Sequence, residues 1–501
     1  MISKIFFKGY LKISVMAPVV FLFLAVMAVA QTIDNVKIPD SPVGKAFVSF
    51  LTAFNSGDIE KLRSFHTEYG GDPSNADMDM QVHSQIGVLK PHSVITSSDY
   101  EIHVLVQAEK KGEWLEFIMS LSSISPFPIE RLGIRPALAP ENVSDKKTTG
   151  SSSTRIKLTD AEIASLIGTY LNDLAIEDKF SGAVLIAKDG KPVFEKAYGL
   201  ANKAKNVPNN IETKFNLGSM NKMFTGVAIA QLAEADKLSF EDKVGKYLSD
   251  YPNKLVADNV TIHQLLTHTS GLGSYWNDKF FKRKSTIRTV ADYLSLFVDE
   301  PLLFEPGQRY RYSNSGYIVL GAIIEKVSGQ NYYDYVRDHI YKTAGMINTD
   351  AYELGKDTPN LAMGYTNTGF DGKPVIGSPI DNTSTLPNKG GPAGGGYSTV
   401  EDLLRFGIAL RDNKLLSSQY TEIVTTGKVT SGPGEYGYGF GVEQLNGMRI
   451  FGYTGGAPGI AAAMSIFPES GYITIVLMNY NSEFMAPVVY KIRELILSAK
   501  D

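Results

Sequence analysis

A serine and a lysine three residues apart could act together as a nucleophile and its base. Ser219 and Lys222 open an apolar run with the spacing of a helix, and residues three apart on a helix share a face, with Cβ atoms about 5–6 Å apart. A serine hydroxyl is a weak nucleophile until a neighbour takes its proton, and a lysine can do so only where desolvation or a nearby cation lowers its pKa. Free N–H groups at a helix start also stabilise developing negative charge. The pair therefore predicts an activated serine.

Each motif taken alone also has an ordinary structural explanation. The serine–lysine spacing recurs at Ser144 and Lys147, in a polar stretch where nothing would desolvate the lysine. A second pattern, Tyr312-x-Asn314, is also weak by itself, since Tyr-x-Asn recurs at 251–253, 275–277 and 365–367. A packed tyrosine, and an asparagine that caps the next apolar run, would account for it. Only agreement among several motifs can indicate chemistry.

Three such elements stand in order along the chain. They are Ser219-x-x-Lys222, Tyr312-x-Asn314, and Tyr453-Thr454-Gly455-Gly456 on a predicted late strand. Further matching phrases are Gln-Leu-Leu-Thr-His-Thr-Ser-Gly-Leu, Phe-Glu-Pro-Gly and Gly-Gly-Gly-Tyr-Ser-Thr, at 264–272, 304–307 and 394–399. Together these motifs resemble the penicillin-binding and class C β-lactamase-like serine hydrolases. The resemblance covers essentially all of residues 158–501.

This resemblance implies a role for each matched residue. Ser219 attacks a carbonyl and forms an acyl-enzyme, which water then releases. Lys222 and Tyr312 share the proton transfers, and the sequence leaves open which of them is the base. Backbone N–H groups of Ser219 and Gly456 form the oxyanion hole, where one donor can be worth about 10²–10³ in rate. No metal or other cofactor is expected. The expected substrate-binding residues are Asn314, Tyr453, Thr454 and Gly455.

Tyr453 departs from the family pattern. The third element usually begins with lysine in class C β-lactamases, and in relatives it can begin with histidine. Tyrosine removes the cation that would meet a substrate carboxylate, and a positive charge that would help to ionise Tyr312. Arg449, on the same side of the strand by alternation, is a candidate for partial replacement. We therefore expect weak or absent β-lactamase activity and an ester or peptide substrate.

Other functions fit the sequence less well. A catalytically inactive module that binds cell-wall peptide stays open because of Tyr453, although the chain keeps the polar residues of the first two elements. No Gly-x-Ser-x-Gly is present for a Ser-His-Asp hydrolase with a nucleophile elbow. The seven histidines are scattered without His-Glu-x-x-His. His268 is interpreted as a structural residue that holds the turn 269–271.

The elements that must position these residues combine strands with helices. Apolar residues at helical spacing predict a helix near 163–174, and Asp189-Gly190 between two apolar runs predicts a hairpin. A mainly helical middle section follows. The late predicted elements are strands at 438–442, 449–453, 462–467 and 472–478 and a helix at 485–497. This order indicates an α+β fold, in which an antiparallel sheet is flanked by helices and carries an inserted helical lobe.

A smaller α+β domain is predicted at residues 31–139. It has an apolar helical pattern between 43 and 54 and strand-like alternation within 100–106 and 113–119. This order resembles the small NTF2-like modules that precede some exported serine hydrolases. Residues 140–157 form a polar linker. No chemistry can be assigned to this first domain.

Residues 1–30 have the order of a secretory signal peptide. Spaced lysines precede an apolar run that ends in Ala28-Val29-Ala30, a typical cleavage site. Retention as a membrane anchor is the alternative. Cleavage would leave a periplasmic or secreted protein without stable membrane insertion.

The composition excludes some kinds of chemistry. The absence of cysteine excludes thiol nucleophiles and disulfides. A net charge of −4 gives no reason to expect nucleic acid, so the expected partner is a small-molecule or peptide substrate.

Overall fold

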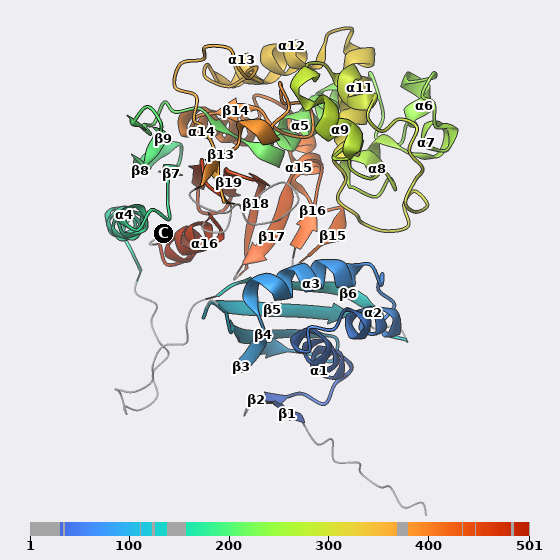
Figure 1. Cartoon of the computed structure of the whole chain (residues 1–501), viewed down its shortest axis with the longest axis vertical. Helices are drawn as coiled ribbons and strands as arrows, with labels where there is room; N and C mark the ends of the chain where they lie inside the picture. Colours follow the sequence, from blue (N-terminus) through green and yellow to red (C-terminus); the bar gives the residue numbers. More distant parts are fainter. Residues whose placement is uncertain are drawn as a thin grey trace, which may run out of the picture.

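The computed structural model describes residues 31–33, 36–110, 112–122, 126–137, 157–367, 379–432, 434–445, 447–481 and 485–499. The predicted signal peptide and nearly all of the predicted linker lie outside the described residues. The described residues form two domains, drawn at the bottom and the top of Figure 1.

The N-terminal domain packs three helices against one face of a four-stranded antiparallel sheet of order β3-β4-β5-β6. Along β4 every second residue, including Ile102, Val104 and Val106, is buried among the helices, as the period of a half-buried strand requires. The likeness of this domain to NTF2-like modules stays a prediction. Its elements are β1 (Gln31–Ile33), β2 (Val36–Ile38), α1 (Pro42–Asn55), α2 (Ile59–Glu68), α3 (Asn75–Ile86), β3 (Leu89–Ser97), β4 (Glu101–Ala108), β5 (Trp114–Leu121) and β6 (Ile129–Pro136).

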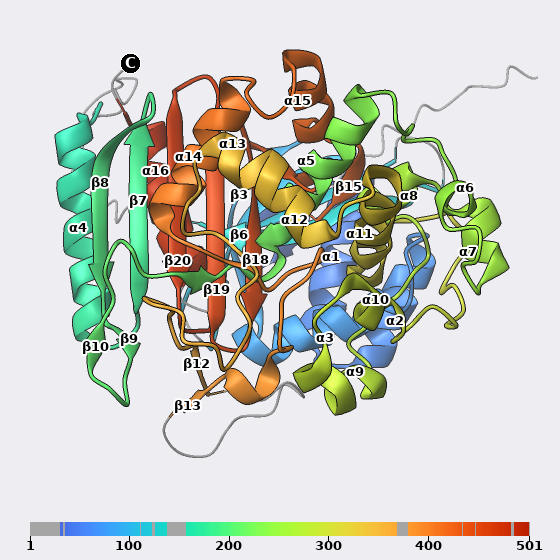
Figure 2. The same ribbon diagram turned by 90° about the horizontal axis from the view of Figure 1, so that it is seen from above.

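The C-terminal domain contains one large antiparallel sheet, of order β15-β16-β17-β18-β19-β20-β7-β8, whose strands come from both the early and the late part of the domain sequence. Figure 2 shows β7 and β20 side by side, although they lie at opposite ends of the domain sequence. The strands of this sheet are β7 (Gly182–Lys188), β8 (Lys191–Tyr198), β15 (Val429–Ser431), β16 (Gly434–Tyr436), β17 (Gly441–Leu445), β18 (Met448–Ala457), β19 (Ile460–Phe467) and β20 (Tyr472–Met478).

Helices cover both faces of the large sheet. Val184 and Ile186 of β7 face the helices α4 and α16, whereas Ala183 and Leu185 face the helical lobe. A strand covered on both faces is apolar throughout rather than alternating, which is why β7 is buried along almost its whole length. The long covering helices are α4 (Asp160–Ile176), α5 (Asn221–Glu234), α11 (Asn314–Ser328), α14 (Val400–Arg411) and α16 (Met485–Leu497).

The inserted lobe and its connections consist of short elements. Their helices are η1 (Gly218–Met220), α6 (Val244–Tyr247), α7 (Lys254–Asn259), α8 (Ile262–Leu266), α9 (Asp278–Arg283), η2 (Lys284–Thr286), α10 (Val290–Leu294), α12 (Tyr332–Val336), η3 (Arg337–Tyr341), α13 (Lys342–Ala344), η4 (Thr383–Thr385) and α15 (Ser418–Thr425). Their strands are β9 (Leu200–Asn202), β10 (Val207–Pro208), β11 (Phe215–Asn216), β12 (Tyr365–Thr366), β13 (Ile380–Asp381) and β14 (Tyr397–Ser398).

The predicted α+β architecture is confirmed, with one local correction. The strand expected at 438–442 begins later, as β17, because Gly437 donates a backbone hydrogen bond to Phe440 and Gly439 adopts a φ of +88°. The residues that precede β17 therefore form a turn. Within the part of the chain that the structure describes, no helix is both long and apolar enough to cross a bilayer.

Candidate active site

Ser219 lies in a tight turn between β11 and α5. It is the middle residue of η1, which runs directly into α5, so the serine lies two residues before the α-helix rather than opening it. Gly218 has a φ of +49°, in the left-handed region that favours glycine. Gly455 of β18 passes so close that a Cβ there would lie 1.9 Å from the carbonyl oxygen of Leu217. The two glycines let the turn and the strand approach each other.

Lys222 is buried because it lies on a helix that is itself buried in the core. Almost every residue of α5 is buried, and Lys222 itself is 0 % exposed. Its Nζ lies 3.2 Å from Ser219 Oγ, 2.8 Å from Asn314 Oδ1 and 2.6 Å from the carbonyl oxygen of Ala393. These three partners are uncharged, and desolvation lowers the pKa of Lys222 well below 10.5. The lysine thus has the desolvated surroundings that a serine-activating base requires.

Tyr312 lies on the other side of the serine, immediately before α11. Its hydroxyl donates a hydrogen bond of 2.7 Å to Ser219 Oγ. Tyr312 keeps 38 % of its surface exposed, but desolvation around the hydroxyl raises its pKa to about 12, although hydrogen bonds with Ser219 and Tyr453 act in the opposite direction. The phenol therefore carries its proton at neutral pH.

The cap of α11 fixes both residues of the second motif. Ser313, rather than Asn314, is the N-cap, and its Oγ accepts the N–H of Gly316 at 3.0 Å. Asn314 is then the first helical residue and turns its side chain to Lys222. His268 contacts this segment through its side chain. Its Nδ1 accepts a hydrogen bond from the backbone N–H of Ser313 at 3.0 Å, and its ring centre lies 4.6 Å from that of Tyr312. The histidine side chain thus supports the tyrosine segment rather than the turn 269–271.

The third element contributes backbone and a tyrosine cluster. The ring of Tyr453 lies 5.6 Å from that of Tyr436, and burial raises the pKa of Tyr453 well above 10. It therefore brings no charge to the site. Thr454 pairs with Ala463, which faces α4 and α16, so its side chain lies on the opposite face of β18 from Tyr453 and Gly455. The expected contact of the Thr454 side chain with substrate is not supported by this placement.

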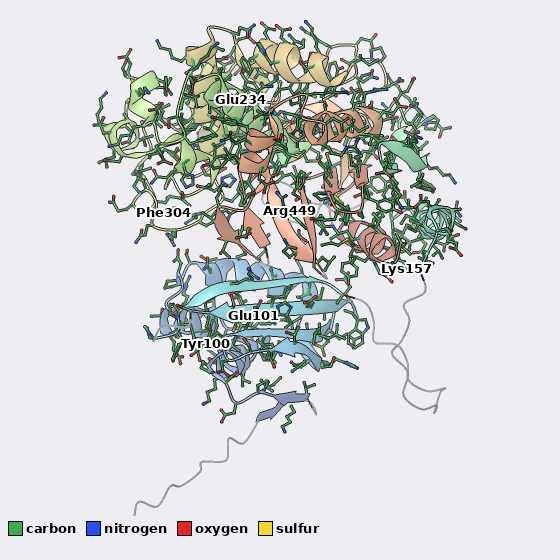
Figure 3. The ribbon with its side chains drawn as sticks, turned by 180° about the vertical axis from the view of Figure 1, so that it is seen from behind. Tyr100, Glu101, Lys157, Glu234, Phe304 and Arg449 are labelled. Carbon is green, nitrogen blue, oxygen red and sulfur yellow. The ribbon has the colours of Figure 1, made fainter. Side chains whose placement is uncertain are left out.

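Arg449 does not replace the missing cation. Its guanidinium donates to the carbonyl oxygen and to Oγ1 of Thr425, both at 2.9 Å, and pairs with Glu422 at 3.3 Å. Figure 3 shows Arg449 at the end of its strand nearest the N-terminal domain. Four residues of strand, about 13 Å, separate it from Tyr453.

A pocket opens beside the serine. Ser219 and Gly456 both line it, as expected for the two backbone donors of an oxyanion hole. Asn314 and the loop that carries Ala393 form another part of its wall. Sequence analysis missed the aromatic part of the lining. Those residues are Tyr275, Trp276, Phe280, Tyr352 and Tyr397.

Known proteins resemble the C-terminal domain in sequence and in structure. The family described as Beta-lactamase matches residues 171–496. The chain belongs to this β-lactamase family. Among its relatives is penicillin-binding protein 4* of Bacillus subtilis (strain 168), 31% identical over 322 residues, which cover 62% of this chain and 70% of the relative.

Solved structures of penicillin-binding proteins share the β-lactamase-family fold. A penicillin-binding protein from Bacillus halodurans has a TM-score of 0.58 and 34% identity, with 65% of this chain and 99% of that one covered. An octameric penicillin-binding protein homologue from Pyrococcus abyssi has a TM-score of 0.59 and 27% identity, with 67% of this chain and 78% of that one covered. The predicted family and fold of the C-terminal domain are therefore confirmed, and the N-terminal domain lies outside the family match.

Proposed function

We propose that this protein is an exported serine hydrolase that acts through an acyl-enzyme on an ester or amide substrate. The observation that carries the proposal is the double contact of Ser219 Oγ, with Lys222 Nζ at 3.2 Å and with the Tyr312 hydroxyl at 2.7 Å. A serine held between a desolvated amine and a protonated phenol has one group to take its proton and one group to give a proton back. Membership of the β-lactamase family supports the same chemistry.

The hydrogen bonds around Lys222 favour the lysine as the base of acylation. A neutral amine has two N–H donors and one lone pair. The carbonyl oxygens of Asn314 and Ala393 accept the two donors, which leaves the lone pair for the Ser219 hydroxyl proton. The lowered pKa of Lys222 agrees with this neutral state. Ser219 Oγ would then bond to the substrate carbonyl carbon while its proton passes to Lys222 Nζ.

Tyr312 suits the second proton transfer. Its hydroxyl already donates toward Ser219 Oγ, the atom that would be bonded to the carbonyl carbon from which the leaving group departs. When the tetrahedral intermediate collapses, the bond between the carbonyl carbon and the leaving group breaks and the leaving atom takes the Tyr312 proton. The proton held by Lys222 then restores the phenol. Water would cleave the acyl-enzyme by the same transfers in reverse.

The site is a poor match for a substrate carboxylate. Tyr453 is uncharged where the family usually has a cation, and Arg449 is bound to Glu422 and Thr425. A β-lactam or a C-terminal D-amino acid would bring its carboxylate to this region without a partner. We therefore propose weak or absent β-lactamase activity and a substrate without that group.

The first test is intact mass spectrometry after incubation with a fluorophosphonate. The parent protein should gain the mass of one adduct that maps to Ser219, because only an activated serine reacts at a useful rate. Ser219→Ala should gain none, and Lys222→Ala should gain it far more slowly. Ser144→Ala, at the linker copy of the motif, is the matched control and should label like the parent. A folded parent without an adduct would favour the inactive, peptide-binding alternative.

Export rests on the sequence of residues 1–30. The test is the mass of the mature protein recovered from outside the cytoplasm, which should begin at Gln31 if the predicted site is cleaved. A full-length mass in the membrane fraction would support a retained anchor instead.

A further inference from the structure

The pocket beside Ser219 has no charged lining. Among the described residues, every side chain that lines it is uncharged, and five aromatic rings form much of its wall. The ring of Tyr275 lies 5.1 Å from Tyr293 and 5.6 Å from Phe280. Both neighbours are buried, so the wall is set by the core of the lobe rather than by a free surface loop. Trp276, 41 % exposed, offers a flat apolar face at this wall.

The position of the proton donor decides which part of the substrate enters this pocket. A leaving group must lie within reach of the group that protonates it, and in the proposed reaction that group is the Tyr312 hydroxyl. Neither Tyr312 nor Tyr453 lines the pocket, whereas Ser219 and Gly456 do. A leaving group within reach of Tyr312 therefore lies outside this pocket, and the pocket takes the acyl group.

We infer that this pocket selects an uncharged, apolar acyl group, best filled by an aromatic ring, so that the substrates are neutral aryl- or alkylcarboxylic esters or amides. The inference rests on the proposed function and adds the substrate class. Aromatic rings pack on aromatic walls with a gain beyond their buried area. A carboxylate in the same place would lose its water without gaining a cation or a set of donors.

The test compares p-nitrophenyl esters that share one leaving group. After correction for spontaneous hydrolysis, kcat/KM for the phenylacetyl ester should exceed that for the acetyl ester by about tenfold or more, because an added apolar group fills the pocket. The pentanoyl ester should exceed the similarly long succinyl ester by about 100-fold or more, because the succinyl carboxylate is desolvated without a partner. A succinyl ester turned over as fast as the pentanoyl ester would overturn the inference.

Variants tie the preference to the pocket. Trp276→Ala should reduce the phenylacetyl-to-acetyl ratio of kcat/KM by about tenfold, since it removes an aromatic wall. Leu255→Ala, an exposed apolar residue on α7 away from the pocket, should keep the parent ratio. A ratio unchanged in Trp276→Ala would contradict the assigned wall. Absence of any ester turnover together with absence of a fluorophosphonate adduct would reject the proposed function itself, whereas adduct formation with the opposite ester preference would reject only this substrate class.

Discussion

Replacing Lys222 by methionine should change how the stability of the C-terminal domain depends on pH. The lysine is fully buried among uncharged partners, and desolvation lowers its pKa well below 10.5. In the unfolded chain the amine is solvated and has its ordinary pKa. Between these two pKa values the unfolded chain binds one more proton than the folded protein, so the parent's free energy of unfolding rises with pH. A methionine cannot contribute to this slope.

The magnitude follows from one proton. Within that window each pH unit changes the parent's free energy of unfolding by about 1.36 kcal/mol. Going from about pH 9.5 down to about pH 7.5, the variant should therefore gain about 2.7 kcal/mol relative to the parent, provided that the folded pKa lies below this range. Methionine also leaves Asn314 Oδ1 and the Ala393 carbonyl without a donor, at about 1–3 kcal/mol each. That cost is independent of pH and leaves the slope intact.

The assay is urea unfolding of parent and variant at several pH values. Fluorescence of Trp276 in a Trp114→Phe background reports the C-terminal domain alone, since these are the two tryptophans of the chain. Lys254→Met, an exposed lysine on α7, corrects for the change in net charge. A parent–variant difference that stays constant with pH would mean that Lys222 keeps its proton in the folded protein. The assignment of Lys222 as the base would then be wrong.

Three further substitutions test other parts of the site. Tyr312→Phe should lower kcat/KM for esters by a factor of about 10²–10⁴, because the proton donor is lost. Its circular dichroism should not change, since the phenylalanine ring can still pack on His268. A loss of less than about fivefold would contradict the role of Tyr312 in proton transfer. Gly455→Ala should abolish fluorophosphonate labelling, because the new Cβ would lie 1.9 Å from the Leu217 carbonyl oxygen, and retained labelling would show that the close approach of β18 is dispensable. Tyr453→Lys should raise cephalosporin turnover by about tenfold or more over both the parent and Tyr453→Phe, since it supplies a partner for the carboxylate, and equal rates in all three proteins would mean that the missing cation does not limit this activity.

The candidate catalytic residues could be predicted from the sequence because each of their motifs is short and local. The spacing of Ser219 and Lys222 places both on one turn, and Tyr312 adjoins a helix start. The acceptor that completes the lysine's surroundings, the Ala393 carbonyl, is backbone and carries no sequence signal beyond its glycine-rich loop. Thr454 was expected to bind substrate, although strand alternation places its side chain on the opposite face of β18 from Tyr453.

The substrate pocket was beyond sequence reasoning for a different reason. Its aromatic wall is assembled from segments far apart in the chain, and none of these segments carries a catalytic motif. Two of its residues did stand in patterns noted in the sequence. Tyr275 belongs to the Tyr275-x-Asn277 copy of the second motif, whose asparagine caps α9, and Tyr397 belongs to the phrase at 394–399. The edge strand β15 and its neighbour β16, three residues each, are too short for hydrophobic periodicity to reveal.

The pairing of β7 with β20 links the first strand of the C-terminal domain to its last. The hydrogen bonds between Gly182–Lys188 and Tyr472–Met478 can form only after the ribosome has synthesised the chain through β20. Pairing between segments so far apart slows folding, because a long loop must close first. A chain truncated before β20 would lose the strand that joins β7 to the sheet, so the enzyme would gain its activity only after β20 has been synthesised.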